Sequence, residues 1–208
     1  SKVGYETFRL GGDRTWYGKE DDMLTRWGYW GDWDKNYDES GKVLEEEYEI
    51  HGNVQGPMQF HSNFGVVTRS KFHDDHYYRE TQPMASMNIT PMAGLRLFAF
   101  TRFGKAIDYD NGQLGKTLVL EGGGEWQIGR HLQLDLEFDY NRLNVDGGQL
   151  FSAKQTDARL TWQFDMRSYL RLVVQYTDIR RNQDLYDYED DVLEEDKVEW
   201  HEKFLATQ

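Results

Sequence analysis

Oxygen-bearing side chains recur at alternate positions in one acidic segment of the sequence. The residues Asp34, Asn36, Asp38, Ser40 and Glu45 stand at positions 1, 3, 5, 7 and 12 of a candidate calcium loop, in which hard oxygen ligands wrap a cation. Position 6 is Glu39, where such loops have Gly, and no flanking helix is indicated. An acidic loop is the simpler interpretation. Calcium held by Asp34, Asn36, Asp38 and Glu45 is the alternative, and no other cofactor is expected.

A second candidate for metal binding is the run His73-Asp74-Asp75-His76. Imidazoles and carboxylates are ligands for zinc and other divalent ions. On a strand, however, His73 and His76 would project to opposite faces, so both can reach one ion only where the chain turns. We therefore interpret this segment as a solvated loop and predict no metal site.

Four aromatic residues lie just before the acidic segment: Trp27, Tyr29, Trp30 and Trp33. Their flat rings are suitable platforms for sugar rings, which makes the segment a candidate ligand-stacking loop. Trp and Tyr also collect at membrane borders, where their amphipathic rings anchor the rim of a barrel. Both interpretations stay open, and rim anchoring or loop packing is the simpler one.

Catalysis has little support in the sequence. The pairs Glu121/Glu125 and Asp135/Glu137 are of the type that hydrolyses glycosides, but acidic residues that face arginines are also ordinary inside β-barrels. Neither a Gly-x-Ser-x-Gly elbow nor a phosphate-binding Gly-x-x-x-x-Gly-Lys loop occurs, and the absence of cysteine removes thiolate nucleophiles. We therefore expect the protein not to be an enzyme.

Charge and composition exclude further classes. The 208 residues include 37 acidic and 24 basic ones, a net charge of -13, which argues against nucleic acid as a partner. The sequence has no apolar run of about 20 residues that would form a transmembrane helix. Aromatic residues make up 15% of the chain, and disordered chains are poor in them. Acid is concentrated in 11–44 and 181–197, which we expect to be loops.

Hydrophobic periodicity identifies the elements that hold these residues. From Leu132 to Asn141 the sequence alternates without a break between apolar and polar residues, which indicates a strand with one apolar face. Similar alternation occurs over 158–165 and, more loosely, over 170–176. Interrupted forms occur over 58–66 and 117–128. No stretch shows the helical period.

An internal repeat orders these strands. Strands open after tight turns at Met58, Leu95, Leu132 and Leu170, at spacings of 37, 37 and 38 residues, so that each period is one hairpin. The opposite connections, at about 69–77, 105–116, 143–152 and 181–197, are polar and are predicted to be longer loops. The pattern predicts an all-β, antiparallel up-and-down meander of about ten strands.

Such a meander with unequal ends is typical of a transmembrane β-barrel or a part of one. Its apolar face would meet lipid, and its polar face would line a wet lumen. Asp135, Glu137, Asp139, Arg159 and Arg171 would set the polarity of that lumen and form salt bridges across the strands. The alternative is a soluble β-barrel or sandwich, in which the apolar rows meet inside around a small apolar ligand or an aromatic loop binds carbohydrate. Periodicity alone is compatible with both arrangements.

The hairpin Thr156–Phe164 and Ser168–Tyr176 carries a family resemblance. With Trp30-Gly31-Asp32-Trp33-Asp34, it resembles the C-terminal outer-membrane barrel of bacterial proteins that have an N-terminal family-9-like carbohydrate-binding domain. The resemblance spans most of the chain and implies a Gram-negative outer membrane and a link to glycans or surface polymers. As a barrel in that membrane, the protein is expected to form a pore, channel or scaffold. It implies no catalytic residues, and the sugar-binding domain is not in this sequence.

The two ends of the sequence both read as strand. Val3, Tyr5, Thr7 and Arg9 begin in mid-pattern, and 204–208 resembles a descending strand. We therefore expect 1–208 to be a single β-barrel region within a larger barrel, with 11–44 and 181–197 as extracellular loops. The expected partners are membrane lipid or lipopolysaccharide, and remaining strands or a partner chain that would close the wall.

Overall fold

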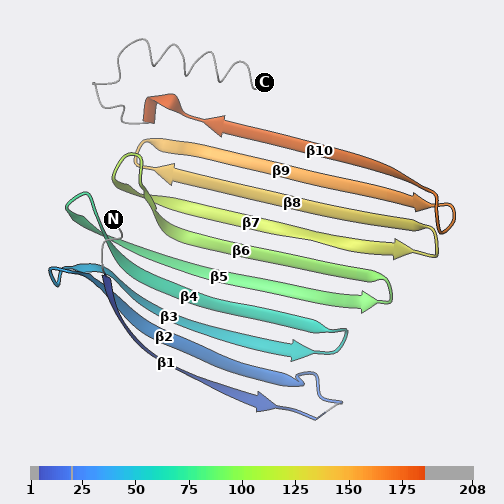
Figure 1. The fold of residues 1–208 in the computed structure, drawn as a ribbon, viewed down its shortest axis with the longest axis horizontal. Helices are drawn as coiled ribbons and strands as arrows, with labels where there is room; N and C mark the ends of the chain where they lie inside the picture. The colour runs from blue at the N-terminus through green and yellow to red at the C-terminus, as the bar shows by residue number, and fades with distance from the viewer. Residues whose placement is uncertain (1–4, 20, 186–208) are drawn as a thin grey trace.

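A computed structural model describes residues 5–19 and 21–185 as one antiparallel sheet of ten strands. The strands follow each other in chain order, and each is hydrogen-bonded to the next (Figure 1). They are β1 (Tyr5–Tyr17), β2 (Arg26–Asp38), β3 (Val43–Gly56), β4 (Phe60–His73), β5 (His76–Met92), β6 (Leu95–Asp108), β7 (Gln113–Ile128), β8 (Leu132–Val145), β9 (Gly148–Gln163) and β10 (Tyr169–Arg181). The predicted all-β meander is confirmed.

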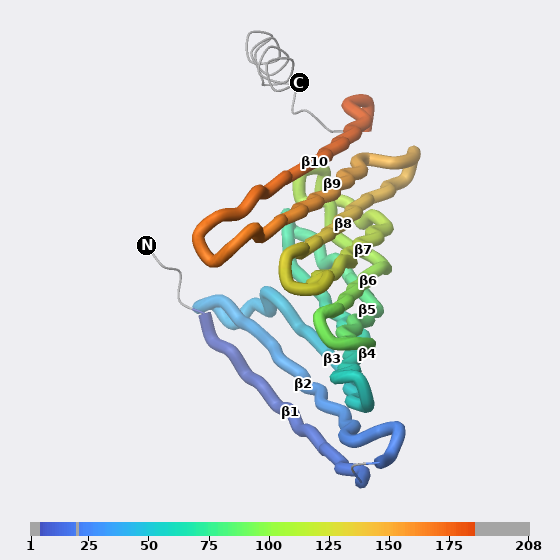
Figure 2. Tube along the Cα trace, turned by 90° about the vertical axis from the view of Figure 1, so that its right-hand side faces the viewer, coloured from blue at the N-terminus to red at the C-terminus, as the bar shows by residue number. Residues whose placement is uncertain are grey.

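The sheet is a single curved layer. Its first strands and its last strands bend toward the same side, with β4–β7 between them (Figure 2). Nearly all contacts between elements join strands that are neighbours in the sheet, so no second layer covers either face in the described part of the chain. There, β1 pairs only with β2 and β10 only with β9, which leaves two open edges.

The two rims of the sheet are similar, which corrects one expectation. The first rim has turns at 18–25, 57–59, 93–94, 129–131 and 164–168, and the second rim has turns at 39–42, 74–75, 109–112 and 146–147. The long loops expected at 69–77, 105–116 and 143–152 are therefore mostly strand, and so is 11–44. Their polar residues continue the backbone ladder, which polar side chains do not interrupt. Of 181–197, the structure describes a 3-10 turn at Gln183–Leu185, and the later residues, like 204–208, lie outside the described range.

Turn chemistry explains how tightly the second rim closes. Asp74 and Asp75 connect β4 to β5 with φ angles of 49° and 58°. Two consecutive residues with positive φ form the two-residue hairpin turn whose twist matches that of the flanking strands, and Asp tolerates this conformation better than most residues do. The segment interpreted as a loop is thus a two-residue turn, with His73 and His76 directly opposite each other at the ends of the two strands.

Alternation divides the sheet into two faces. We call the side of Asp135, Glu137 and Asp139 the polar face and the side of Leu134 and Leu136 the apolar face, and the register carries both across all ten strands. Large hydrophobic residues on the apolar face are 36% to 65% exposed: Phe8, Leu10, Tyr29, Tyr48, Ile50, Phe64, Tyr77, Met87, Leu97, Phe103, Leu120, Trp126, Leu136, Phe138, Leu160, Trp162, Leu170, Leu172, Val174 and Tyr176. Buried hydrophobic residues are few, so this sheet has no enclosed core.

Candidate functional site

A ladder of charged residues of both signs crosses the polar face from β1 to β5. Its members are Arg9, Asp34, Glu47, Arg69 and Glu80, each directly opposite the next in the strand register. Nη2 of Arg9 donates to Oδ2 of Asp34 at 3.0 Å, and Nη1 of Arg69 lies 3.6 Å from Oε2 of Glu47. The Nε of Arg69 lies 3.1 Å from Oε2 of Glu80 without the alignment of a hydrogen bond. We call these five residues the charge ladder.

The charge ladder lies on the more crowded side of the sheet. The side chains of Asp34 and Glu80 are only 8% and 7% exposed. Glu80 also accepts the backbone N–H of Ile107 on β6 at 2.8 Å. Because curvature brings side chains together on the inside of a bend, these exposures place the polar face on the concave side and the apolar face on the convex side.

The predicted lumen residues lie together on the polar face of β8–β10. Asp135 is directly opposite Arg159, and Arg171 lies on the next strand, opposite Thr161. Their side chains form no ion pair in the described structure. Asp135 instead accepts a hydrogen bond from Nε2 of Gln133 at 2.9 Å, and the Arg171 guanidinium lies over the Tyr169 ring at 5.2 Å. The shared face was predicted, but the expected salt bridges do not form.

Carboxylates face each other nearby on the polar face. Glu121 is opposite Asp139, and Glu137 is opposite Asp157. Gly123 lies opposite Glu137 on β7, and a Cβ there would lie 2.8 Å from the Phe98 ring, so that only glycine allows Phe98 to lie across the strand. Like charges in opposite positions destabilise a sheet unless water or counter-ions screen them. This part of the polar face is therefore built for hydration.

The aromatic segment is a strand and not a loop, so the ligand-stacking loop predicted at Trp27, Tyr29, Trp30 and Trp33 is not formed. Alternation on β2 sends Trp27, Tyr29 and Trp33 to the apolar face and Trp30 to the polar face. Trp30 stacks on His51 with ring centroids 4.1 Å apart, and His51 Nε2 lies 2.9 Å from Glu49. The His51 ring lies against Gly65, where a Cβ would collide with it.

The candidate calcium segment is also extended. Asp34, Asn36 and Asp38 lie along β2 and Glu45 on β3, so they do not form the loop that would wrap a cation. Asp34 pairs with Arg9, and Oδ1 of Asp38 accepts the Ser40 hydroxyl at 2.6 Å and the Lys42 backbone N–H at 2.9 Å. These bonds, the Ser40 hydroxyl first, hold the pKa of the Asp38 carboxyl at this turn below its usual value. No group of three or more His, Asp or Glu side chains suited to a metal occurs among the described residues.

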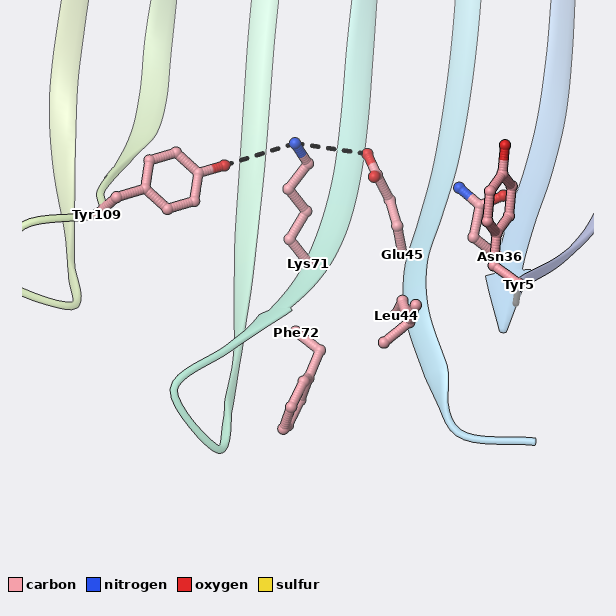
Figure 3. Close-up of a pocket in the computed structure, with 7 residues that line it drawn as sticks. All are labelled: Tyr5, Asn36, Leu44, Glu45, Lys71, Phe72 and Tyr109. Atoms are coloured by element: carbon pink, nitrogen blue, oxygen red, sulfur yellow. Dashed lines mark hydrogen bonds and ion pairs between the residues drawn. The ribbon is translucent and has the colours of Figure 1, made fainter. Parts of the chain in front are cut away.

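A shallow hollow of about 520 Å³ lies at the second rim. Lys71 reaches across it between two neighbours, 3.8 Å from Oε1 of Glu45 and 3.5 Å from the Tyr109 hydroxyl (Figure 3). His73 packs edge-on against Tyr109 with centroids 5.2 Å apart. The residues that line the hollow are Tyr5, Asn36, Leu44, Glu45, Lys71, Phe72 and Tyr109. The hollow is an open recess in the wall rather than an enclosed ligand site.

Sequence reasoning did not find the charge ladder. The alternation of Glu45, Glu47 and Glu49 was visible in the sequence, and so was that of Arg69 and Lys71. Joining them requires the register between strands, since Arg9 and Asp34 are 25 residues apart. The available signal was acidic residues at alternate positions in one segment and basic residues at alternate positions in the segment that follows it.

The helical content of the described residues is a short 3-10 turn, and no helix there is long and apolar enough to cross a membrane. Comparisons of the chain with protein-family models, with curated proteins and with solved structures gave no match. The resemblance to outer-membrane barrels with a family-9-like carbohydrate-binding domain therefore stays a prediction from the sequence.

Proposed function

We propose that the ten strands form part of the wall of a transmembrane β-barrel in a bacterial outer membrane. There the protein acts as a pore, channel or scaffold and not as an enzyme. The observation that carries this proposal is the apolar face, which is continuous across ten strands and which nothing in the described chain covers. Soluble proteins rarely leave apolar patches beyond a few hundred Å² exposed. A surrounding of lipid chains removes that cost without a second layer of protein.

The dimensions of the apolar face agree with a bilayer. On β8 the apolar row extends from Leu132 to Tyr140 and then gives way to Arg142. Nine residues of strand are about 30 Å long, and a tilt of about 40° reduces this to a height of about 23 Å, close to the apolar band of about 25 Å in outer-membrane barrels. The remainder of each strand would project beyond the bilayer at the second rim.

The polar face suits a wet interior. The charge ladder and the opposed carboxylates, Glu121 with Asp139 and Glu137 with Asp157, lie on the concave side. In lipid such groups would cost several kcal/mol each, whereas lumen water solvates them. Asp135, Glu137, Asp139, Arg159 and Arg171 would set the polarity of that lumen. The two open edges cannot face lipid, so closure requires further strands or a partner chain.

The soluble alternative fits the same strands less well. A soluble up-and-down barrel places its apolar rows on the inside, where they pack into a core. Here the more buried side carries Asp34, His51 and Glu80, and Leu136 on the other side is 46% exposed. A soluble form would need the opposite curvature or a second layer.

A link to carbohydrate is the second candidate function, and Trp30 is the residue that favours it. Of Trp27, Tyr29, Trp30 and Trp33, Trp30 alone lies on the polar face, where it is 40% exposed beside Glu49 and Asp32. A sugar that passes the lumen wall could stack on this ring. Quenching of tryptophan fluorescence by a soluble oligosaccharide, lost in Trp30→Phe and kept in Trp33→Phe, would support the link.

The main proposal is tested by folding the purified chain with and without mild detergent. We expect a β-rich circular dichroism spectrum only with detergent, and a band on a denaturing gel that migrates differently before and after boiling. A β-rich, monomeric protein that stays soluble without detergent would overturn the proposal and would direct attention to ligand screening.

A further inference from the structure

A row of basic residues borders the apolar face on its second-rim side. Its members, one on each strand from β6 to β10, are Lys105, Lys116, Arg142, Lys154 and Arg180. We call them the basic row. They lie toward the second rim on the apolar face, as Arg142 does after Tyr140, and Ile107 and Leu114 continue that face beyond Lys105 and Lys116. In a chain with a net charge of -13, this concentration of positive charge on one border requires an explanation.

The members of the basic row are neighbours across the sheet. Lys105 and Lys116 are directly opposite each other. Arg142 is diagonal to Lys116, because Lys116 pairs with Asn144. Arg142 is opposite Ser152, which lies two residues from Lys154, and Lys154 is opposite Asp178, which lies two residues from Arg180. Arg142, Lys154 and Arg180 are therefore successive diagonal neighbours. Direct and diagonal partners have Cβ atoms about 5 Å and about 7–8 Å apart, so these charges repel one another.

A single carboxylate offsets part of this repulsion. Arg180 pairs with Asp178 at 3.1 Å, and Asp178 is the one acidic residue on the apolar face of the described parts of β6–β10. No ion pair joins Lys105, Lys116, Arg142 or Lys154 to a carboxylate among the described residues. Lys105, Lys116 and Lys154 are exposed. Lys154 lies over the Tyr140 ring at 5.7 Å.

The opposite border of the apolar face is different. Near the first rim its tryptophans are Trp16, Trp27, Trp126 and Trp162, and Arg14 is the one strand cation on that face there in the described residues. The second-rim border of β6–β10 is therefore strongly basic, whereas on β1–β5 the same border carries both signs, with Lys35 paired to Glu46. A basic border beside an apolar band matches a membrane surface in which phosphate groups lie at the edge of the hydrocarbon.

We propose that the basic row binds the phosphate groups of anionic lipids and so anchors the second rim at a negatively charged leaflet. The inference rests on the proposed membrane barrel, since lipid headgroups reach these residues only if the apolar face is in the hydrocarbon. Long Lys and Arg side chains extend from strand ends to the headgroup level. Lipid phosphates there would supply the anions that the fold itself lacks.

The test uses the full chain and vesicles of two compositions, phosphatidylcholine alone and phosphatidylcholine with about one third phosphatidylglycerol. The folded, vesicle-bound fraction is measured by flotation and by the unheated gel band. The double variant Lys105→Gln/Lys116→Gln is compared with Arg96→Gln/Arg102→Gln, which removes the same charge from the polar face of β6. Each basic residue near an anionic surface contributes about fivefold in partitioning.

We expect wild-type chain to partition more strongly into the phosphatidylglycerol vesicles, and this gain to fall about 25-fold in the basic-row variant and little in the polar-face variant. Salt at 0.5 M should suppress the gain in the wild type, which requires no variant to fold. Equal binding to both vesicles, or equal loss in both variants, overturns the inference and leaves the barrel proposal standing. A third outcome is that inorganic phosphate abolishes the preference for phosphatidylglycerol vesicles while sodium chloride of the same ionic strength does not. That result would overturn the lipid inference in favour of a site for free phosphate. Failure to insert in either vesicle overturns both proposals.

Discussion

Arg69 and Glu80 lie 3.1 Å apart across the pair β4–β5, with Glu80 almost fully buried on the polar face. The pair links the charge ladder to the backbone of β6, because Glu80 also accepts the N–H of Ile107. We predict that Arg69→Met lowers the free energy of unfolding by about 1–3 kcal/mol, below the 3–5 kcal/mol seen for fully buried pairs, since the Arg69 side chain is 25% exposed. Urea unfolding in detergent measures this change.

The control for this substitution lies on the same strand and face. Lys71 is 3.8 Å from Glu45, and both side chains are 26% exposed. Lys71→Met should change stability by less than about 1 kcal/mol, as for partly exposed pairs elsewhere. Equal losses in the two variants would mean that the charge ladder has no special role in holding the strands together.

Leu136 lies at the centre of the apolar row of β8, between Gly124 and Ala158. We predict that Leu136→Arg lowers insertion into vesicles by an amount equivalent to about 2–4 kcal/mol, because it places a charge at the level of the bilayer midplane. The matched substitution Glu137→Arg, on the next residue and the other face, should insert normally. The unheated gel band measures both, and normal insertion of Leu136→Arg would contradict the lipid-facing assignment.

The turn at Asp74 and Asp75 gives a prediction about stability alone. Both residues have positive φ, a conformation that glycine adopts freely and β-branched residues adopt poorly. We expect Asp75→Gly to raise the unfolding midpoint slightly and Asp75→Val to lower stability by about 1–3 kcal/mol. The opposite order would mean that the hairpin turn differs from the one described.

Asp38 gives a prediction about pH. Hydrogen bonds from the Ser40 hydroxyl and then from the Lys42 backbone lower the pKa of this carboxyl in the folded turn. A lowered folded-state pKa means that the turn is stabilised above the ordinary Asp value of about 3.9 and loses this contribution as the pH falls through the depressed value. Ser40→Ala should shift the NMR titration of Asp38 upward, and an unchanged titration would exclude the hydroxyl as the main cause.

The sequence predicted some parts of this architecture well, for reasons that particular residues show. Alternation from Leu132 to Asn141 gave both the strand and its faces, because a period of two is local information. It also placed Asp135 and Arg159 on one face. The strand end at 105–108 was taken for part of a loop, because Lys105 and Asp108 are charged and interrupt the apolar period, although Ile107 and Asp108 are buried there.

Other features can be predicted only when it is known which residues of neighbouring strands lie opposite each other. Trp27, Trp30 and Trp33 were grouped by proximity in the sequence, although a spacing of three residues sends Trp30 to the face opposite the other two. The charge ladder joins residues from strands whose pairing no local pattern specifies. The salt bridge expected at Asp135 did not form, because shared register fixes Cα positions and leaves the side chain free to choose Gln133.

In the proposed barrel, alternate residues of β8 face lipid and water. The chain contains no cysteine, so single-cysteine variants at Leu134, Asp135, Leu136 and Glu137 can each carry one fluorescent label. With the labelled protein in vesicles, we predict that lipid-soluble quenchers reach the labels at 134 and 136, and that water-soluble quenchers reach those at 135 and 137. Labels at all four positions that respond only to the water-soluble quencher, or an alternation in the opposite phase, would contradict the account.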